Sequence, residues 1–202
     1  GREPTSRELQ RVESVLNSIR VLARKDVKAR IASMNSLSKG KGLGFSASAF
    51  ASLGLAAVRA LNLQISPREL SEIVRLGTGS ATRSLVGGYA IWYARKRGLS
   101  YAEQLAKPGD IDMQMIVVPI HSEVKTEMAH QEALTSPFFD VRLRYLRRAL
   151  AKMKRAIRLR DTARICELTE IDTLNLHATT MTGDSRLFVL KPETLRVMET
   201  VA

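Results

Sequence analysis

Several features that are scarce or absent in this sequence exclude whole classes of protein. The 202 residues contain one cysteine, Cys166, so no internal disulfide can form and a reducing compartment such as the cytoplasm is expected. No run of about 18 apolar residues occurs, so neither a membrane span nor a membrane partner is expected. Residues 1–6 are polar and lack the apolar core of a secretory leader. The sequence therefore predicts a cytoplasmic globular protein, with Cys166 as a small buried residue on a helix.

Aromatic side chains are also few, at 5% of the chain. Basic residues outnumber acidic ones, with 32 Lys and Arg and 20 Asp and Glu, which gives a net charge of +12. Much of the excess lies in residues 142–160, where Leu146, Leu150, Met153 and Ile157 recur at helical spacing. This pattern predicts a helix whose basic side is a solvated face. Because few aromatics could stack on bases and no helix-turn-helix or zinc-ligand spacing occurs, no nucleic-acid partner is expected. A basic nucleic-acid-binding module remains the alternative from a different functional class.

Helix signals occur along the whole chain. Ser6 is the predicted N-cap of a first helix, residues 46–61 form a small-residue helix, and Ser66 caps a helix with Pro67 in its first position. In the second half, a helix is predicted over residues 140–159, and Asp161 caps another that reaches residue 177 or beyond. Pro192 is placed in the first turn of a last helix. The second half of the chain is thus predicted to be nearly all helical.

Strands are predicted only in the first part of the chain. Residues 27–33 alternate in polarity, residues 85–93 are mostly apolar, and residues 113–120 form a continuous apolar run typical of a buried strand. Residues 95–110 are predicted to be a polar excursion between strands. A mixed first half and a helical second half indicate an α+β fold, with a domain boundary between residues 122 and 137.

Residues 77–92 combine small hydroxyl side chains, one arginine and a Gly-Gly pair ahead of an apolar run. Small hydroxyls let an anion approach the backbone, and the guanidinium of Arg83 can hold a carboxylate or a phosphate through two parallel hydrogen bonds. Gly87 and Gly88 permit a backbone path that other residues resist. This combination predicts a binding site for an anionic small molecule.

A glycine-rich loop at residues 38–44 precedes the helix predicted from residue 46. Backbone amides at a helix N-terminus form an anion site, and nearby lysines add the positive charge that phosphoryl transfer needs. The loop is not a Walker sequence, because no Gly-Lys-Ser or Gly-Lys-Thr run is present. The candidate phosphate-binding residues are Lys41, Gly42, Gly44, Ser46 and Ser48.

Segments in matching order along nearly the whole chain resemble the diphosphomevalonate decarboxylases, ATP-dependent enzymes of the GHMP kinase superfamily. Residues 77–88 read Gly-Thr-Gly-Ser-Ala-Thr-Arg-Ser-Leu-Val-Gly-Gly, similar to the family signature Gly-Ser-Gly-Ser-Ala-Cys-Arg-Ser-Leu-Phe-Gly-Gly. Residues 35–50 are in register with the family's Gly-Leu-Ala-Ser-Ser-Ala-Ser phosphate loop. Residues 135–139, 176–180 and 191–195 also look like family signatures.

The resemblance implies a GHMP-kinase-like two-domain α/β sandwich that is incomplete here. An N-terminal domain would span residues 1–122, and residues 123–202 would begin a mainly helical C-terminal domain. It implies ATP-dependent decarboxylation of mevalonate 5-diphosphate to isopentenyl diphosphate, in which the 3-hydroxyl is phosphorylated before phosphate and carbon dioxide leave. The implied ligands are a phosphorylated mevalonate, ATP and Mg²⁺, and the implied assembly is a homodimer.

The resemblance also implies roles for individual residues. Arg83 and Ser46 would be catalytic, with Arg83 orienting the substrate carboxylate, while Thr78, Ser80 and Lys125 would bind substrate phosphate. The glycine-rich loop residues and Ser46 would hold the ATP phosphates. No metal site built by protein side chains is expected, because His177 has no second ligand at metal-binding spacing and fits a core or supporting position better.

The sequence departs from the family pattern in ways that leave alternatives open. Phe45 replaces the first serine of the family's Ser-Ser pair, and the spacing from Met128 to Thr135 is one residue longer. The family's N-terminal Lys-Tyr-Trp-Gly-Lys segment and its later Asp-Ala-Gly-Pro-Asn segment, which carries the catalytic aspartate, are absent. The chain is therefore expected to be an internal fragment that is inactive alone, with a degenerate protein as the alternative. The alternatives are a phosphomevalonate decarboxylase acting on mevalonate 5-phosphate and a superfamily kinase that does not decarboxylate.

Overall fold

The computed structural model describes residues 3–34, 44–94, 100–121, 124 and 126–201. These residues divide into two compact units, unit 1 up to Gly109 and unit 2 from Asp110 onward. The domain boundary expected at residue 122 stays a prediction. Within the described ranges, no helix combines the length and the apolar character needed to cross a membrane.

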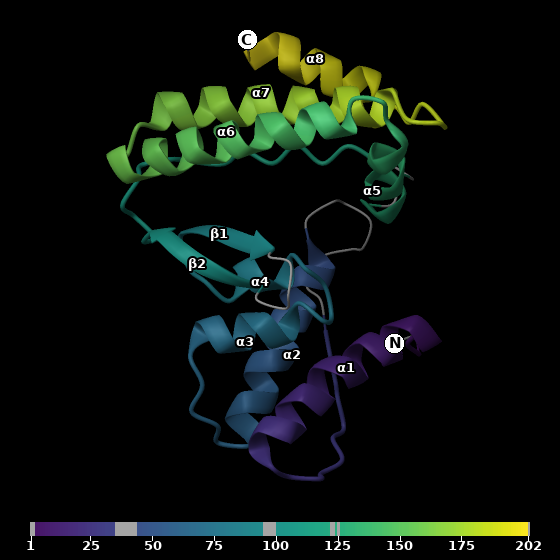
Figure 1. Cartoon of the computed structure of the whole chain (residues 1–202), viewed down its shortest axis with the longest axis vertical. Helices are drawn as coiled ribbons and strands as arrows, with labels where there is room; N and C mark the ends of the chain where they lie inside the picture. The colour runs from purple at the N-terminus through teal and green to yellow at the C-terminus, as the bar shows by residue number, and fades with distance from the viewer. Residues whose placement is uncertain (1–2, 35–43, 95–99, 122–123, 125, 202) are drawn as a thin grey trace. The chain divides into compact units, whose positions relative to one another are not determined.

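Unit 1 contains four helices and a hairpin among its described residues (Figure 1): α1 (Ser6–Ala23), α2 (Phe45–Ala60), α3 (Pro67–Val74), α4 (Ala81–Ser84), β1 (Tyr89–Ala94) and β2 (Ser100–Ala106). Ser66 caps α3 as predicted, and Glu69 completes a capping box with it. Hydrogen bonds from Ser66 hold the pKa of the Glu69 carboxyl below its ordinary value. The predicted N-cap Ser6 is wrong by one residue. Thr5 caps α1, because Glu8 stands three residues after it and closes a second capping box.

The strand predictions were less accurate than the helix predictions. β1 begins at Tyr89 and not at residue 85, since α4 ends at Ser84 and residues 85–88 form the irregular connection to the strand. The polar excursion predicted over residues 95–110 contains β2, which pairs antiparallel with β1. Residues 27–33 and 113–120 have no regular secondary structure, and the apolar side chains of Met115 and Ile116 are exposed. A strand needs a neighbour to accept its backbone hydrogen bonds, and none pairs with these two segments in the described chain.

The core of unit 1 joins its first three helices. Val15 and Ile19 of α1 pack with Phe50 of α2 and with Leu70 and Val74 of α3. Close approach of α2 and α3 depends on Gly54: a Cβ there would lie 2.4 Å from Val74 Cγ1. The short helix α4 packs against α2, so this helical core holds α4 in place.

From residue 126 onward the described part of unit 2 is mainly helical, as predicted: α5 (Thr126–Thr135), α6 (Phe139–Leu159), α7 (Thr162–Met181) and α8 (Pro192–Val201). α6 and α7 lie side by side in Figure 1, and the Asp161 side chain caps α7 by accepting a hydrogen bond from the Arg164 amide. Ile165 and Leu168 bury one side of α7. The expectation of a buried Cys166 is wrong, because Cys166 follows Ile165 by one residue, a rotation of about 100° that exposes it.

A buried arginine joins α6 to α7. Arg142 is 8% exposed, and its Nη1 lies 3.1 Å from Asp172 Oδ1 and donates to the Asn175 side chain. We expect Arg142→Ala to lower the free energy of unfolding of unit 2 by about 2–3 kcal/mol, because buried polar partners lose their donor. Amide hydrogen exchange in α6 and α7 measures this. The matched control is Arg147→Ala, an exposed arginine of the same helix, which should change exchange little; equal effects of the two changes would contradict the prediction.

Candidate functional site

The segment between α3 and β1 is held by a chain of local hydrogen bonds. The amides of Gly77 and Thr78 both donate to the Val74 carbonyl, at 3.0 and 3.3 Å. The amide of Ala81 then donates to the Thr78 carbonyl, and the hydroxyl of Thr82, which is fully buried, donates to the Gly79 carbonyl at 2.8 Å. The backbone therefore turns twice before α4 begins.

Two glycines of this segment touch aromatic rings. A Cβ on Gly77 would lie 2.1 Å from the Phe50 ring, and a Cβ on Gly79 would lie 2.5 Å from the Trp92 ring. Arg11 of α1 adds a third contact, since its Nε donates to the Gly77 carbonyl and its guanidinium lies 5.0 Å from the centre of the Phe50 ring. Sequence reasoning missed Arg11 and Phe50, because their partners lie far away in the chain and no local pattern indicates them.

The three substrate-site candidates of this segment end up on or near its surface. Thr78 and Ser80 are half-buried, and Arg83 is exposed. The Arg83 guanidinium lies 5.9 Å from the centre of the Trp92 ring. Among the described residues it has no carboxylate partner and no hydrogen-bond acceptor. The structure thus leaves the donor edges of the Arg83 guanidinium open, on the segment that also carries Thr78 and Ser80.

The second group of candidates lies at the N-terminus of α2. Gly44 is the N-cap, in the left-handed region at φ +72°, and no side chain caps the helix. The first turn has no acidic residue, and Ser46 there is exposed. The Ser48 hydroxyl donates to the Phe45 carbonyl of its own helix, at 3.0 Å. Lys41 and Gly42 lie outside the described residues. The uncapped amides and the helix dipole make this end suitable for an anion.

Unit 2 holds the remaining segments that the sequence singled out. Lys125 lies outside the described residues. Ser136 is buried, and its hydroxyl lies 2.8 Å from the Thr182 hydroxyl, which ties residues 135–139 to the end of α7. His177 of α7 is half-buried, and burial lowers its pKa below the ordinary value. Within the described ranges, no three His, Cys, Asp or Glu side chains form a metal-binding group.

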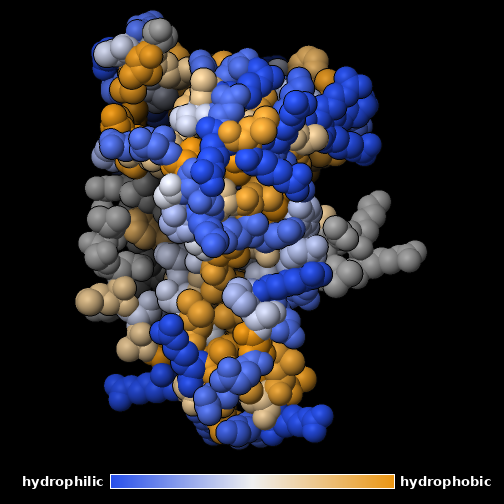
Figure 2. Space-filling model, turned by 90° about the vertical axis from the view of Figure 1, so that its left-hand side faces the viewer, coloured by the Kyte–Doolittle hydropathy of each residue, from blue (hydrophilic) through white to orange (hydrophobic). Residues whose placement is uncertain are grey.

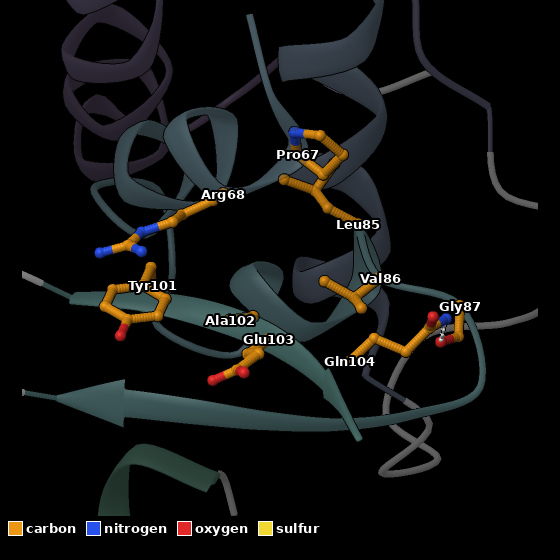
Figure 3. Close-up of a pocket in the computed structure, with 9 residues that line it drawn as sticks. All are labelled: Pro67, Arg68, Leu85, Val86, Gly87, Tyr101, Ala102, Glu103 and Gln104. Carbon is orange, nitrogen blue, oxygen red and sulfur yellow. Dashed lines mark hydrogen bonds between the residues drawn. The ribbon is translucent and has the colours of Figure 1, made fainter. Parts of the chain in front are cut away.

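A separate hollow of about 480 Å³ opens between the start of α3, the end of α4 and β2 (Figure 3). The Arg68 guanidinium stacks 3.8 Å from the centre of the Tyr101 ring at one end, and Gln104 Nε2 donates to the Gly87 carbonyl at the other, at 2.6 Å. Arg83 does not line this hollow. The hollow and the candidate anion site therefore use different side chains of unit 1.

The chain matches known proteins over most of its length. The family model described as "Diphosphomevalonate decarboxylase-like N-terminal domain" matches residues 1–102. The phosphomevalonate decarboxylase of Haloferax volcanii is 31% identical over 202 residues, which are 100% of this chain and 62% of that protein. The chain thus spans less than two thirds of the length of this relative.

Solved structures agree with this match. Mevalonate diphosphate decarboxylase from Staphylococcus aureus has a TM-score of 0.83 and 30% identity, covering 100% of this chain and 62% of that one. The complex of MDDEF with MVAPP, AMPPCP and magnesium has a TM-score of 0.80 and 27% identity, covering 98% of this chain and 62% of that one. The expected α+β fold of the GHMP kinase type, incomplete relative to these structures, is confirmed.

Proposed function

Because this chain belongs to the diphosphomevalonate decarboxylase-like family, we propose that the protein containing it decarboxylates mevalonate 5-diphosphate to isopentenyl diphosphate with the use of ATP. The observation that carries the proposal is the open guanidinium of Arg83, on a segment fixed by ring contacts at Gly77 and Gly79. A carboxylate that leaves as carbon dioxide must first be oriented, and a forked cation on a rigid segment performs that task.

The other candidates take supporting roles in this proposal. Thr78 and Ser80 bind the substrate phosphate through their hydroxyls, with Lys125 adding charge. The ATP phosphates bind at the N-terminus of α2, to Gly44 and Ser46 together with Lys41, Gly42 and Ser48. The packing of α2 against α4 fixes the ATP-binding helix and the helix of Arg83 in one unit. The resemblance implies that the catalytic aspartate belongs to the family's Asp-Ala-Gly-Pro-Asn segment, which these 202 residues do not include.

The N-terminus of α2 has the chemical character of a phosphate-binding site. Its first turn offers backbone amides and an exposed hydroxyl, with no carboxylate to repel phosphate. These features fit an anion, and the relative solved with AMPPCP, an ATP analogue, and magnesium supports the assignment. Bound ATP would supply the phosphoryl group that makes the 3-hydroxyl a leaving group, with magnesium balancing its charge. The proposal includes a cytoplasmic location and a homodimer.

A second candidate function is decarboxylation of mevalonate 5-phosphate to isopentenyl phosphate. It is favoured by the Haloferax volcanii relative, which is named a phosphomevalonate decarboxylase and matches the chain from end to end. The two functions differ in the number of phosphates that the site must hold. Residues near Lys125, where the sequence departs from the family spacing, would decide this difference.

The experiment uses the full-length gene product that contains these residues, incubated with ATP, magnesium and either phosphorylated mevalonate. Carbon dioxide and ADP are followed together. We expect both products from mevalonate 5-diphosphate. Both products from mevalonate 5-phosphate alone would select the second candidate. ADP without carbon dioxide would identify a kinase, and no product from either substrate would overturn the enzymatic proposal.

A further inference from the structure

The outer side of α6 carries a dense set of positive charges that the proposed reaction does not use. We define the basic face of α6 as six exposed side chains: Arg144, Arg147, Arg148, Lys152, Arg155 and Arg158. At 3.6 residues per turn these six lie within an arc of about 140°. Figure 2 shows hydrophilic residues, in blue, over much of the surface of the part of the molecule that contains α6 and α7.

None of the six cations is neutralised within the described part of the chain. No ion pair or hydrogen bond joins any of them to a described side chain. The sole acidic residue of α6 is Asp140, in the first turn, where it complements the helix dipole. The buried residues Arg142, Ala156 and Ile157 lie on the opposite side of the helix, so α7 packs away from the basic face.

This arrangement is unfavourable for the helix alone. Arg144 and Arg148, Arg148 and Lys152, and Arg155 and Arg158 stand three or four residues apart, where side chains are neighbours on a helix and like charges repel. Most surface helices relieve such repulsion with interspersed carboxylates, and this face has none beyond its first turn. A bound polyanion would remove the repulsion along the whole face.

The chemistry of the face selects one kind of polyanion. Five of the six cations are arginines, whose planar guanidinium matches phosphate oxygens in pairs. From Arg144 to Arg158 the helix rises about 21 Å at 1.5 Å per residue, close to six base-pair steps of a duplex at 3.4 Å each. No aromatic side chain lies among the six to stack on unpaired bases. On the side of α6 that faces α7, Ala156 and Ile157 are buried, whereas Leu143 and Leu150 are exposed. A lipid surface is therefore the competing partner that the experiment must distinguish.

We propose that the basic face of α6 binds the phosphate backbone of a nucleic-acid duplex without reading its sequence. The inference does not depend on the proposed enzymatic function, since it uses none of the residues assigned to that reaction. From the sequence alone, the basic side of this helix is expected to be a solvated face with no binding role. The structure adds that the six cations share one arc, point away from α7 and have no described partners.

The test measures binding of the 202-residue chain to two random-sequence 24-base-pair DNA duplexes by fluorescence anisotropy, at 50 and 200 mM salt. Six phosphate contacts predict a fall in affinity of about 1000-fold over this range, the same for both sequences. The test variant is Arg144→Gln/Arg148→Gln/Arg155→Gln. It should bind at least 10-fold more weakly at 50 mM salt, and its slope of log affinity against log salt should be smaller by about 2.7.

The matched control is Lys28→Gln/Arg30→Gln/Arg59→Gln, which removes three exposed positive charges from unit 1. The control should bind within about 3-fold of the unchanged chain, and circular dichroism should show equal helix content in all three proteins. Equal weakening of both variants would overturn the proposal, because net charge alone would then explain binding. Absence of duplex binding, or binding only to vesicles containing phosphatidylserine, would overturn it as well.

Discussion

Replacing Arg83 with alanine is expected to lower kcat/KM for carbon dioxide release by about 1000-fold in the full-length protein, under the proposed function. The side chain is exposed, and among the described residues its guanidinium makes no hydrogen bond or ion pair and lies 5.9 Å from the centre of the Trp92 ring. Its removal therefore takes a carboxylate-binding group from the site without removing a core contact. Arg83→Lys should recover only part of the activity, because an ammonium keeps the charge and loses the paired hydrogen bonds.

The control for Arg83→Ala is Arg59→Ala, which removes an exposed arginine at the end of α2. It should leave kcat/KM unchanged. Thermal unfolding of both variants should lie within about 2 °C of the parent protein, since a weak exposed cation–π contact is the only interaction lost at Arg83. Activity of Arg83→Ala within 3-fold of the parent would remove Arg83 from the mechanism. A large fall in melting temperature would instead assign it a structural role.

The second large effect is expected at Gly77. Gly77→Ala should lower the free energy of unfolding of unit 1 by about 2–3 kcal/mol, because the new methyl group would lie 2.1 Å from the Phe50 ring. Gly77 is not among the residues with positive φ, so the backbone itself accepts alanine and the ring contact carries the cost. Denaturant unfolding followed by the fluorescence of Trp92, the single tryptophan of the chain, reports on unit 1.

Two further variants make this test specific. Gly87→Ala is the matched control, since its Cβ would lie 3.6 Å from Pro108 Cγ in ordinary contact, and it should change stability by less than about 0.5 kcal/mol. Phe50→Leu shortens the opposing side chain. The double variant Gly77→Ala/Phe50→Leu should therefore be at least about 1 kcal/mol more stable than the sum of the single changes predicts. Strict additivity would show that the cost arises elsewhere.

Helices were predicted well because their signals are local. Ser66 with Glu69, and Asp161 before α7, are caps whose partners stand three residues away. The strands depended on distant partners. Residues 113–120 have the composition of a buried strand and form none among the described residues, whereas β2 contains the polar Glu103 and Gln104 and was missed. A sequence pattern states which side chains favour a strand, but pairing decides whether one forms.

The same limit applies to the candidate site. Arg83, Thr78 and Ser80 were predicted from their residue types and from a family signature, both readable in a short window, and their roles stay a prediction. The residues that hold this segment in place could not be predicted in the same way, because Phe50 and Arg11 contact it only through tertiary packing. Cys166 is exposed because another side of α7 packs into unit 2. The residues next to Cys166 in the sequence do not indicate which side of the helix that is.

The two-stranded sheet has a consequence for the behaviour of the protein in concentrated solution. Among the described residues β1 and β2 pair only with each other, so each keeps one outer edge, and the apolar run at Met115, Ile116 and Val117 is exposed and has no regular secondary structure. Open edges and extended apolar segments are the elements from which aggregates grow. The net charge of +12 opposes such growth by mutual repulsion. Colloidal stability of this chain should therefore fall as added salt screens that charge, even where folding is unaffected.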